Sequence, residues 1–267
     1  MRESLFEKLK KKELNYLDEL IKIYSLIYGQ YNNTYDYFYS AFKNSKFNVF
    51  ADDLDSALSE IFEGENNIYS YESSFSEKLD KARYSNSNVT LDCFLDYLEL
   101  FKNLLQYSGR TTQNVIQINN IINFDCDKLG YKFETDEDVI RVMLKNPTAE
   151  AVAIQSNESV RSKIYKYLMI RSGHIDDKRN CIKSLADDVE NICKTYKNIP
   201  EYDKLKQFIQ CTRHTKDSPK KEFPFYYKDE EKWLDKTFDM IIGILAFTKT
   251  KEIVSEIKKL ENNTSEG

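Results

Sequence analysis

Hydrophobic residues recur at steps of three and four along most of this chain, which is the spacing that buries one face of a helix. The clearest case is the segment 90–105, where leucine and phenylalanine alternate with polar residues at these steps. Glycine and proline are scarce, at 7 and 4, whereas sandwiches and barrels need turn residues roughly every eight to twelve positions. The pattern predicts helices over residues 3–28, 31–44, 53–62, 90–105, 111–129, 157–172, 176–193, 202–211 and 229–247.

Residues 131–145 interrupt this pattern, because apolar and polar positions alternate there as in a β-strand. The alternation surrounds an acidic tip made of Glu134, Asp136, Glu137 and Asp138. Clustered carboxylates in a turn favour a solvated hairpin tip over a metal site. The sequence therefore predicts a mainly α fold, a multi-helix bundle in two lobes, with one small β-hairpin around 131–145.

A chain of 267 residues is long enough for one large domain or for two smaller ones, and of these we favour two helical lobes in contact. Serine and asparagine are frequent in 64–90, which indicates a loop-rich region within the first lobe. We place the N-terminal helical lobe at 1–125, the hairpin and C-terminal helical domain at 126–262, and a frayed tail at 263–267.

The composition is that of a folded, soluble protein, with 41% hydrophobic and 31% charged residues. The first residues, MRESLFEKLKKKE, are charged where a secretory signal would be apolar, and the longest apolar stretch, 240–247, is far below the ~20 residues that span a bilayer. Five cysteines, an odd number, fit reduced thiols better than a disulfide framework. We expect a cytoplasmic protein without membrane contact.

Charge is distributed unevenly along the chain. The net charge of −5 argues against non-specific coating of nucleic acid, which depends on many phosphate-neutralising cations. Residues 161–183 nevertheless carry seven basic side chains against two acidic ones, and a second basic segment contains Arg213, Lys216, Lys220 and Lys221. A solvated helix face explains such runs equally simply.

Both histidines of the chain lie near an arginine, as Arg171 with His174 and Arg213 with His214. An imidazole transfers protons near neutral pH and a guanidinium binds phosphate, so these pairs suit phosphodiester chemistry. The alternatives are an interhelical link for His174 and a helix C-terminus stabilised by the imidazole of His214. Cys211 lies at metal-ligand spacing from His214, but the other cysteines are scattered singly, and no phosphate loop or dinucleotide motif is present. We expect no metal and no cofactor.

Three motifs occur in order over roughly 115–248, namely KYLMIRSGHIDDKRN, SLADDVE and QFIQCTRHTKD, and a tryptophan-bearing helix follows them. This order resembles the C-terminal HEPN-like domain of bacterial abortive-infection proteins, which act in phage defence. The resemblance implies a homodimeric, metal-independent endoribonuclease in which the His assists attack by a ribose 2′-hydroxyl and the Arg stabilises the phosphate. It implies catalytic roles for Arg171, His174, Arg213 and His214. If the RNA substrate is tRNA or another structured RNA, the local basic charge predicts that it is bound by Lys178, Arg179, Lys216, Lys220 and Lys221.

The spacing of the pairs departs from that family, in which four to six residues separate the Arg from the His. Two residues separate Arg171 from His174, and none separate Arg213 from His214. Adjacent helical residues point about 100° apart, so the second pair can address one phosphate only at a helix end, or with Arg171 or Arg179 brought in by folding or dimerisation. The alternative function is a non-catalytic helical module that binds a phage or host protein.

Overall fold

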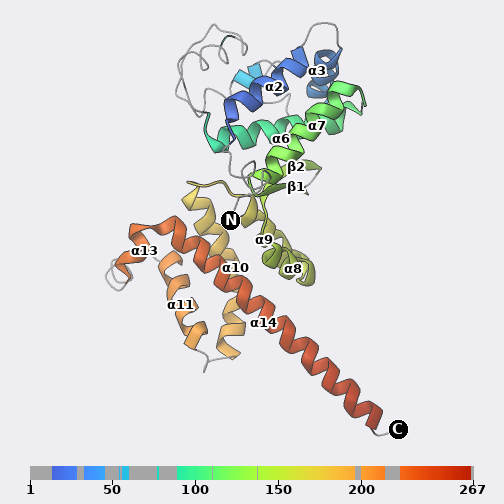
Figure 1. Ribbon diagram of the computed structural model, residues 1–267. Coiled ribbons are helices and arrows are strands. Elements are labelled where there is room, and N and C mark those ends of the chain that lie inside the picture. Colours follow the sequence, from blue (N-terminus) through green and yellow to red (C-terminus); the bar gives the residue numbers. More distant parts are fainter. Residues whose placement is uncertain are drawn as a thin grey trace, which may run out of the picture. The chain divides into compact units, whose positions relative to one another are not determined.

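The computed structural model describes residues 14–28, 33–45, 54, 56–59, 77, 89–109, 111–136, 138–195, 200–213 and 223–265 (Figure 1). Helices dominate these residues and a two-stranded antiparallel sheet is the only sheet among them, which confirms the mainly α fold with one small hairpin. None of the described helices is both long and apolar enough to cross a membrane. The chain forms two compact units, residues 1–144 and 145–267.

Unit 1 is built around α6 (Leu91–Ser108), whose Thr90 cap accepts a hydrogen bond from the Cys93 amide at 3.2 Å. Nine residues of this helix are buried, and the Tyr97 hydroxyl donates to the Leu58 carbonyl at 2.6 Å. The other described elements of the unit are α2 (Tyr16–Tyr28), α3 (Thr34–Asn44), α7 (Gln113–Lys128), β1 (Tyr131–Asp136) and β2 (Val139–Leu144).

The tyrosine-rich segment forms α3 and packs into this core. Phe38 and Phe42 are fully buried, and the Phe38 ring meets the edge of the Phe101 ring at 6.3 Å between centroids. The aromatic residues on the buried side of α3 therefore serve contacts between helices. The predicted helix over 53–62 is described only at 54 and 56–59, and nearly all of the predicted loop-rich region 64–90 lies outside the described residues.

The hairpin packs on α6 through side chains that bond to its backbone. Buried Asn103 accepts from the Ile140 amide and donates to the Ile140 carbonyl, at 2.8 and 2.7 Å. Glu99 accepts from the Val142 amide at 3.0 Å and pairs with Arg141 at 2.7 Å. The hairpin therefore belongs to unit 1, and the boundary lies after Leu144 and not after residue 125 as the sequence predicted.

Asp125 on α7 is an unusual core residue, because its side chain is buried and its Oδ2 atom has no hydrogen-bond partner among the described residues. Burial and the nearby Glu19 carboxylate raise the pKa of Asp125 to about 7, although Lys22 and Lys128 oppose this rise. The folded state therefore favours the neutral carboxyl group in acidic solution.

Unit 2 is organised around the first half of α14 (Glu230–Ser265), which buries Leu234, Phe238 and Ile241. The tryptophan-bearing helix is thus central to its unit, but it continues to Ser265 and does not end near 247 as the sequence predicted. All residues from 250 to 261 are exposed. The other described helices are α8 (Pro147–Gln155), α9 (Glu158–Met169), α10 (Ile175–Thr195), α11 (Pro200–Arg213) and α13 (Pro224–Lys228).

Candidate functional site

The first Arg/His pair lies in the segment 170–174 that joins α9 to α10, here called the link. α9 ends at Met169, three residues before the predicted end, and Gly173 adopts the left-handed conformation with φ of +84°. The His174 carbonyl accepts the Lys178 amide at 3.1 Å, so His174 begins the hydrogen-bonding pattern of α10. The sequence therefore correctly identified a tight interhelical link around Gly173 and His174.

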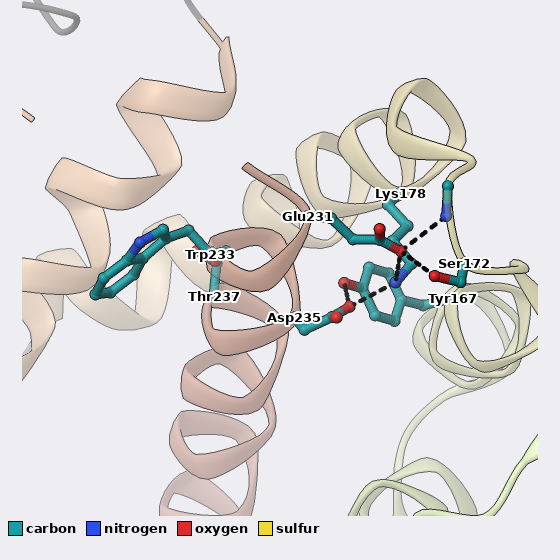
Figure 2. A network of polar contacts seen from close by, with 8 residues as sticks. Tyr167, Ser172, Lys178, Glu231, Trp233, Asp235 and Thr237 are labelled. Carbon is teal, nitrogen blue, oxygen red and sulfur yellow. Dashed lines mark hydrogen bonds and ion pairs between the residues drawn. The ribbon is translucent and has the colours of Figure 1, made fainter. Parts of the chain in front are cut away.

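Glu231, in the first turn of α14, holds this link (Figure 2). Its Oε1 atom accepts from the Gly173 amide at 3.0 Å and from the Ser172 hydroxyl at 3.2 Å. The same atom accepts from the Lys178 ammonium at 2.9 Å. One carboxylate on α14 thus joins the link to the first turn of α10.

Lys178 is only 7% exposed and also donates to Asp235 at 2.8 Å (Figure 2). Asp235 in turn accepts from the Tyr167 hydroxyl at 2.7 Å, and the Tyr167 ring stacks on Phe238 at 4.0 Å. Burial lowers the pKa of Lys178, but the hydrogen bonds to Asp235 and Glu231 outweigh burial and raise this pKa overall. Lys178 is therefore a charged residue of the helix interface, and both of its partners are carboxylates of the same chain.

Arg179, the neighbouring cation predicted to bind RNA, is engaged in the same way. Its Nε and Nη2 atoms donate to Glu230 Oε1 at 2.9 and 2.8 Å, and its Nη1 atom pairs with Asp176. Burial opposes the charge of Arg179, but the bond to Glu230 outweighs it and the pKa is raised. The positive charges of Lys178 and Arg179 are thus balanced by carboxylates of α10 and α14.

His174 differs from these two cations in its exposure. The His174 side chain is 58% exposed, and its Nδ1 atom lies 3.6 Å from Asp177 Oδ2. Arg171, three residues earlier in the link, is partly exposed. The structure therefore presents the imidazole of the first pair to solvent from an anchored backbone.

The second pair follows α11, which ends at Arg213. His214, Lys216, Lys220 and Lys221 lie outside the described residues, as does the side chain of Arg213. The end of α11 is nevertheless located, because the Tyr227 hydroxyl of α13 donates to the Cys211 carbonyl at 3.2 Å.

A chain of contacts connects the end of α11 with the beginning of α10. α13 directly precedes Glu230 and Glu231, which bind Arg179 and the link respectively. Arg179 and Cys211 both influence the pKa of Tyr227, which burial and Cys211 raise to about 12. The carboxyl end of α11 and the amino end of α10 thus lie at the same end of unit 2.

An aromatic cluster supports this end of the unit. The Phe208 ring of α11 stacks on the Trp233 ring at 5.3 Å and on the Tyr226 ring at 6.2 Å. Phe225 contacts Trp233 at 4.9 Å, and Lys236 lies 4.5 Å from the centre of the Trp233 ring. These rings pack α11, α13 and α14 together near Arg213, the last residue of α11.

The sequence did not identify Tyr167, Glu231 and Asp235 as members of a network. The available signal was the spacing of Glu231 and Asp235, which are four residues apart and share one face of a helix. The hydrophobic pattern of the sequence cannot show which residue binds Glu231 and Asp235, because that residue, Lys178, is more than 50 positions away in the chain.

Two further features of unit 2 lie among described residues that the sequence did not select as a site. A cleft of about 210 Å³ is lined by Asn157, Asp188, Ile192, Leu245 and neighbouring residues, towards the far end of α10 from His174. Within the described part of the chain, no three His, Cys, Asp or Glu side chains come together as a metal-binding group. Cys181 is a buried thiol whose pKa is raised to about 11 by burial, which makes it a poor nucleophile.

No protein-family model, curated protein or solved structure gives a significant match to this chain. Its function is therefore inferred from its own residues and their geometry.

Proposed function

We propose that this protein is a metal-independent endoribonuclease of the abortive-infection type that acts on structured RNA. One end of unit 2 carries the reaction, with Arg171, His174, Arg213 and His214 as its catalytic residues. The observation that carries the proposal is the meeting of two helix ends, since the contacts of Tyr227, Glu230 and Glu231 bring the end of α11 to the beginning of α10.

This arrangement explains how two Arg/His pairs with unsuitable spacing can act on one phosphate. Neither Arg/His pair alone has the separation found in the resembling family, but residues from two segments at one end of a unit can address one phosphate together. One imidazole takes the proton of a ribose 2′-hydroxyl as its oxygen attacks the phosphorus, and an arginine stabilises the charge that develops on the phosphate. The P–O5′ bond breaks to leave a 2′,3′-cyclic phosphate, and the departing 5′-oxygen takes a proton from the second imidazole. Because Lys178 and Arg179 are paired with carboxylates, the basic segment 213–221 supplies the cations for RNA binding.

Incubation of the purified protein with total RNA and a tRNA pool in EDTA tests this proposal. We expect cleavage by the parent protein and at least a hundredfold slower cleavage by His214→Ala and His174→Ala, because general acid–base catalysis contributes ~10²–10⁴-fold. Arg171→Ala should also cleave RNA more slowly than the parent protein. Lys194→Ala is its matched control, because it removes an exposed cation towards the far end of α10 and should cleave normally.

Cleavage that is unchanged in both histidine variants would reject the assigned residues. Absence of cleavage by the parent protein across both RNA pools would reject the proposed activity. The fluorescence of Trp233, the only tryptophan, verifies that each variant keeps unit 2 folded.

A second function, binding to another protein, is favoured by the far half of α14. Ile253, Val254, Ile257 and Leu260 are between 46% and 61% exposed and recur at helical steps on one side of this helix. An exposed apolar face of this kind is typical of helix pairing. A second copy of the chain is one partner that would cover it and would give the homodimer expected from the sequence.

Sedimentation at rising protein concentration tests this second function. Pairing through α14 predicts a mass that moves from 31.5 kDa towards twice that value. Ile257→Asp should suppress the change, whereas Ser255→Asp should not, because Ser255 lies about 200° around the helix from Ile257. A mass of 31.5 kDa at every concentration would exclude pairing between copies through this face.

A further inference from the structure

We propose that Glu231 is a positioning residue, which fixes the backbone of the link and thereby the direction in which His174 presents its imidazole. The inference rests on the proposed ribonuclease function and adds to it a residue outside both Arg/His pairs. Glu231 acts from α14, 57 residues after His174, so its role does not follow from any sequence motif.

The geometry concentrates three donors on one oxygen atom. Glu231 Oε1 accepts the Ser172 hydroxyl, the Gly173 amide and the Lys178 ammonium, at 3.2, 3.0 and 2.9 Å. Figure 2 shows the Glu231 side chain directed from α14 towards Ser172 and Lys178. The two link residues directly before His174 are therefore bonded to a helix that the unit buries at its centre.

Two backbone hydrogen bonds of the link span only two or three residues. The His174 amide reaches the Arg171 carbonyl only at 3.4 Å, and the Ile175 amide bonds to the Gly173 carbonyl at 2.9 Å. Gly173 is in the left-handed conformation, which glycine leaves readily for others. Loss of the Glu231 contacts would thus free the peptide group between Ser172 and Gly173, one residue before His174.

Lys178 keeps the Glu231 carboxylate ionised. Burial alone would raise the pKa of Glu231, but the bond from Lys178 and the bond from the Gly173 amide lower it. An ionised carboxylate accepts stronger hydrogen bonds than a neutral one, so the anchor is effective at neutral pH.

Asp235 provides a matched control. It shares Lys178 with Glu231, at 2.8 Å, and it also binds Tyr167, but the structure gives it no bond to the link. Asp235→Asn therefore perturbs the same lysine while it leaves Ser172 and Gly173 bonded. Glu231→Gln is the conservative variant, because its amide oxygen still accepts from the link, whereas Glu231→Ala removes every acceptor.

The first measurement is by NMR on the full chain. We expect the Gly173 amide to exchange about tenfold faster in Glu231→Ala, and within about twofold of the parent rate in Asp235→Asn and Glu231→Gln. The chain has two histidines, so His214→Ala assigns the two imidazole signals. The His174 signal should shift in Glu231→Ala and stay in place in Asp235→Asn.

The second measurement is the rate of RNA cleavage. Glu231→Ala should lower kcat at least tenfold with little change in KM, and Glu231→Gln should recover most of the loss. Unchanged Gly173 exchange and an unchanged His174 signal in Glu231→Ala would overturn the positioning role, whether or not RNA is cleaved. If Glu231→Ala alters the link but the parent protein never cleaves RNA, the contact of Glu231 with the link is supported and the proposed ribonuclease activity is rejected. The catalytic role of that contact is then rejected as well.

Discussion

Replacement of Lys178 by methionine tests how much the network of Tyr167, Lys178, Glu231 and Asp235 stabilises unit 2. The variant keeps a side chain of similar length but removes the ammonium that donates to Glu231 and Asp235 at 2.9 and 2.8 Å. Two carboxylates would then face an apolar thioether at the contact between α10 and α14.

The magnitude follows from the exposure of the groups. Breaking a fully buried ion pair costs about 3–5 kcal/mol, because the remaining charge is left without a partner. Here the Lys178 side chain is 9% exposed, but the Glu231 and Asp235 side chains are 27% and 48% exposed, so water takes over part of the lost interaction. We therefore expect Lys178→Met to lower the free energy of unfolding of unit 2 by about 2–3 kcal/mol.

Urea unfolding followed by the fluorescence of Trp233 is the appropriate assay, because the only tryptophan lies in unit 2 and reports on that unit alone. Lys232→Met is the control, since Lys232 is exposed and pairs with exposed Asp229 at 3.5 Å, and it should change stability by less than about 0.5 kcal/mol. A Lys178→Met protein as stable as the parent would refute the view that the network holds α10 on α14, because removal of Lys178 leaves the Glu231 and Asp235 carboxylates without its ammonium.

Three further predictions concern buried polar groups. The pKa of Asp125 is raised to about 7 in the folded state and is near 3.8 when unfolded. The free energy of unfolding should therefore fall by up to about 4 kcal/mol as pH rises from about 4 to 7, and level off above that. Hydrogen exchange in α7, corrected for its intrinsic pH dependence, should show this loss in the parent protein and not in Asp125→Asn. Asn103→Ala should release the hairpin from α6, with faster exchange of the Ile140 amide and no change in α9, as checked by NMR. Tyr97→Phe removes the buried hydrogen bond to the Leu58 carbonyl and should destabilise the protein by about 1–2 kcal/mol, whereas Tyr226→Phe should be neutral or stabilising because the Tyr226 hydroxyl has no partner among the described residues. Thermal melts of both variants decide this contrast.

Much of the secondary structure could be predicted because it depends on local rules. Thr90, Thr112 and Asn157 each cap a helix through a side-chain oxygen, and Gly173 takes the left-handed conformation expected at a helix end. The helix over 229–247 was likewise predicted from its apolar residues, several of which are buried in the first half of α14.

The unit boundary and the network could not be predicted, because both depend on contacts between distant residues. Asn103 binds Ile140 across 37 positions and thereby assigns the hairpin to unit 1. Lys178 was expected to bind RNA on the basis of local charge, yet its partners lie on a helix that begins 52 residues later. A run of cations along the sequence thus does not determine whether the folded surface is positive, since distant carboxylates can balance it.

The chemistry of the RNA ends tests the central claim most directly. The purified protein is incubated with a tRNA pool in EDTA, and the new 3′ ends are analysed in parallel for the parent, His174→Ala and His214→Ala. Attack by the ribose 2′-hydroxyl predicts 2′,3′-cyclic phosphate ends that appear with the parent protein and are lost with the imidazoles. Products that lack the cyclic phosphate, or equal amounts of it from all three proteins, would contradict a ribonuclease built from these Arg/His pairs.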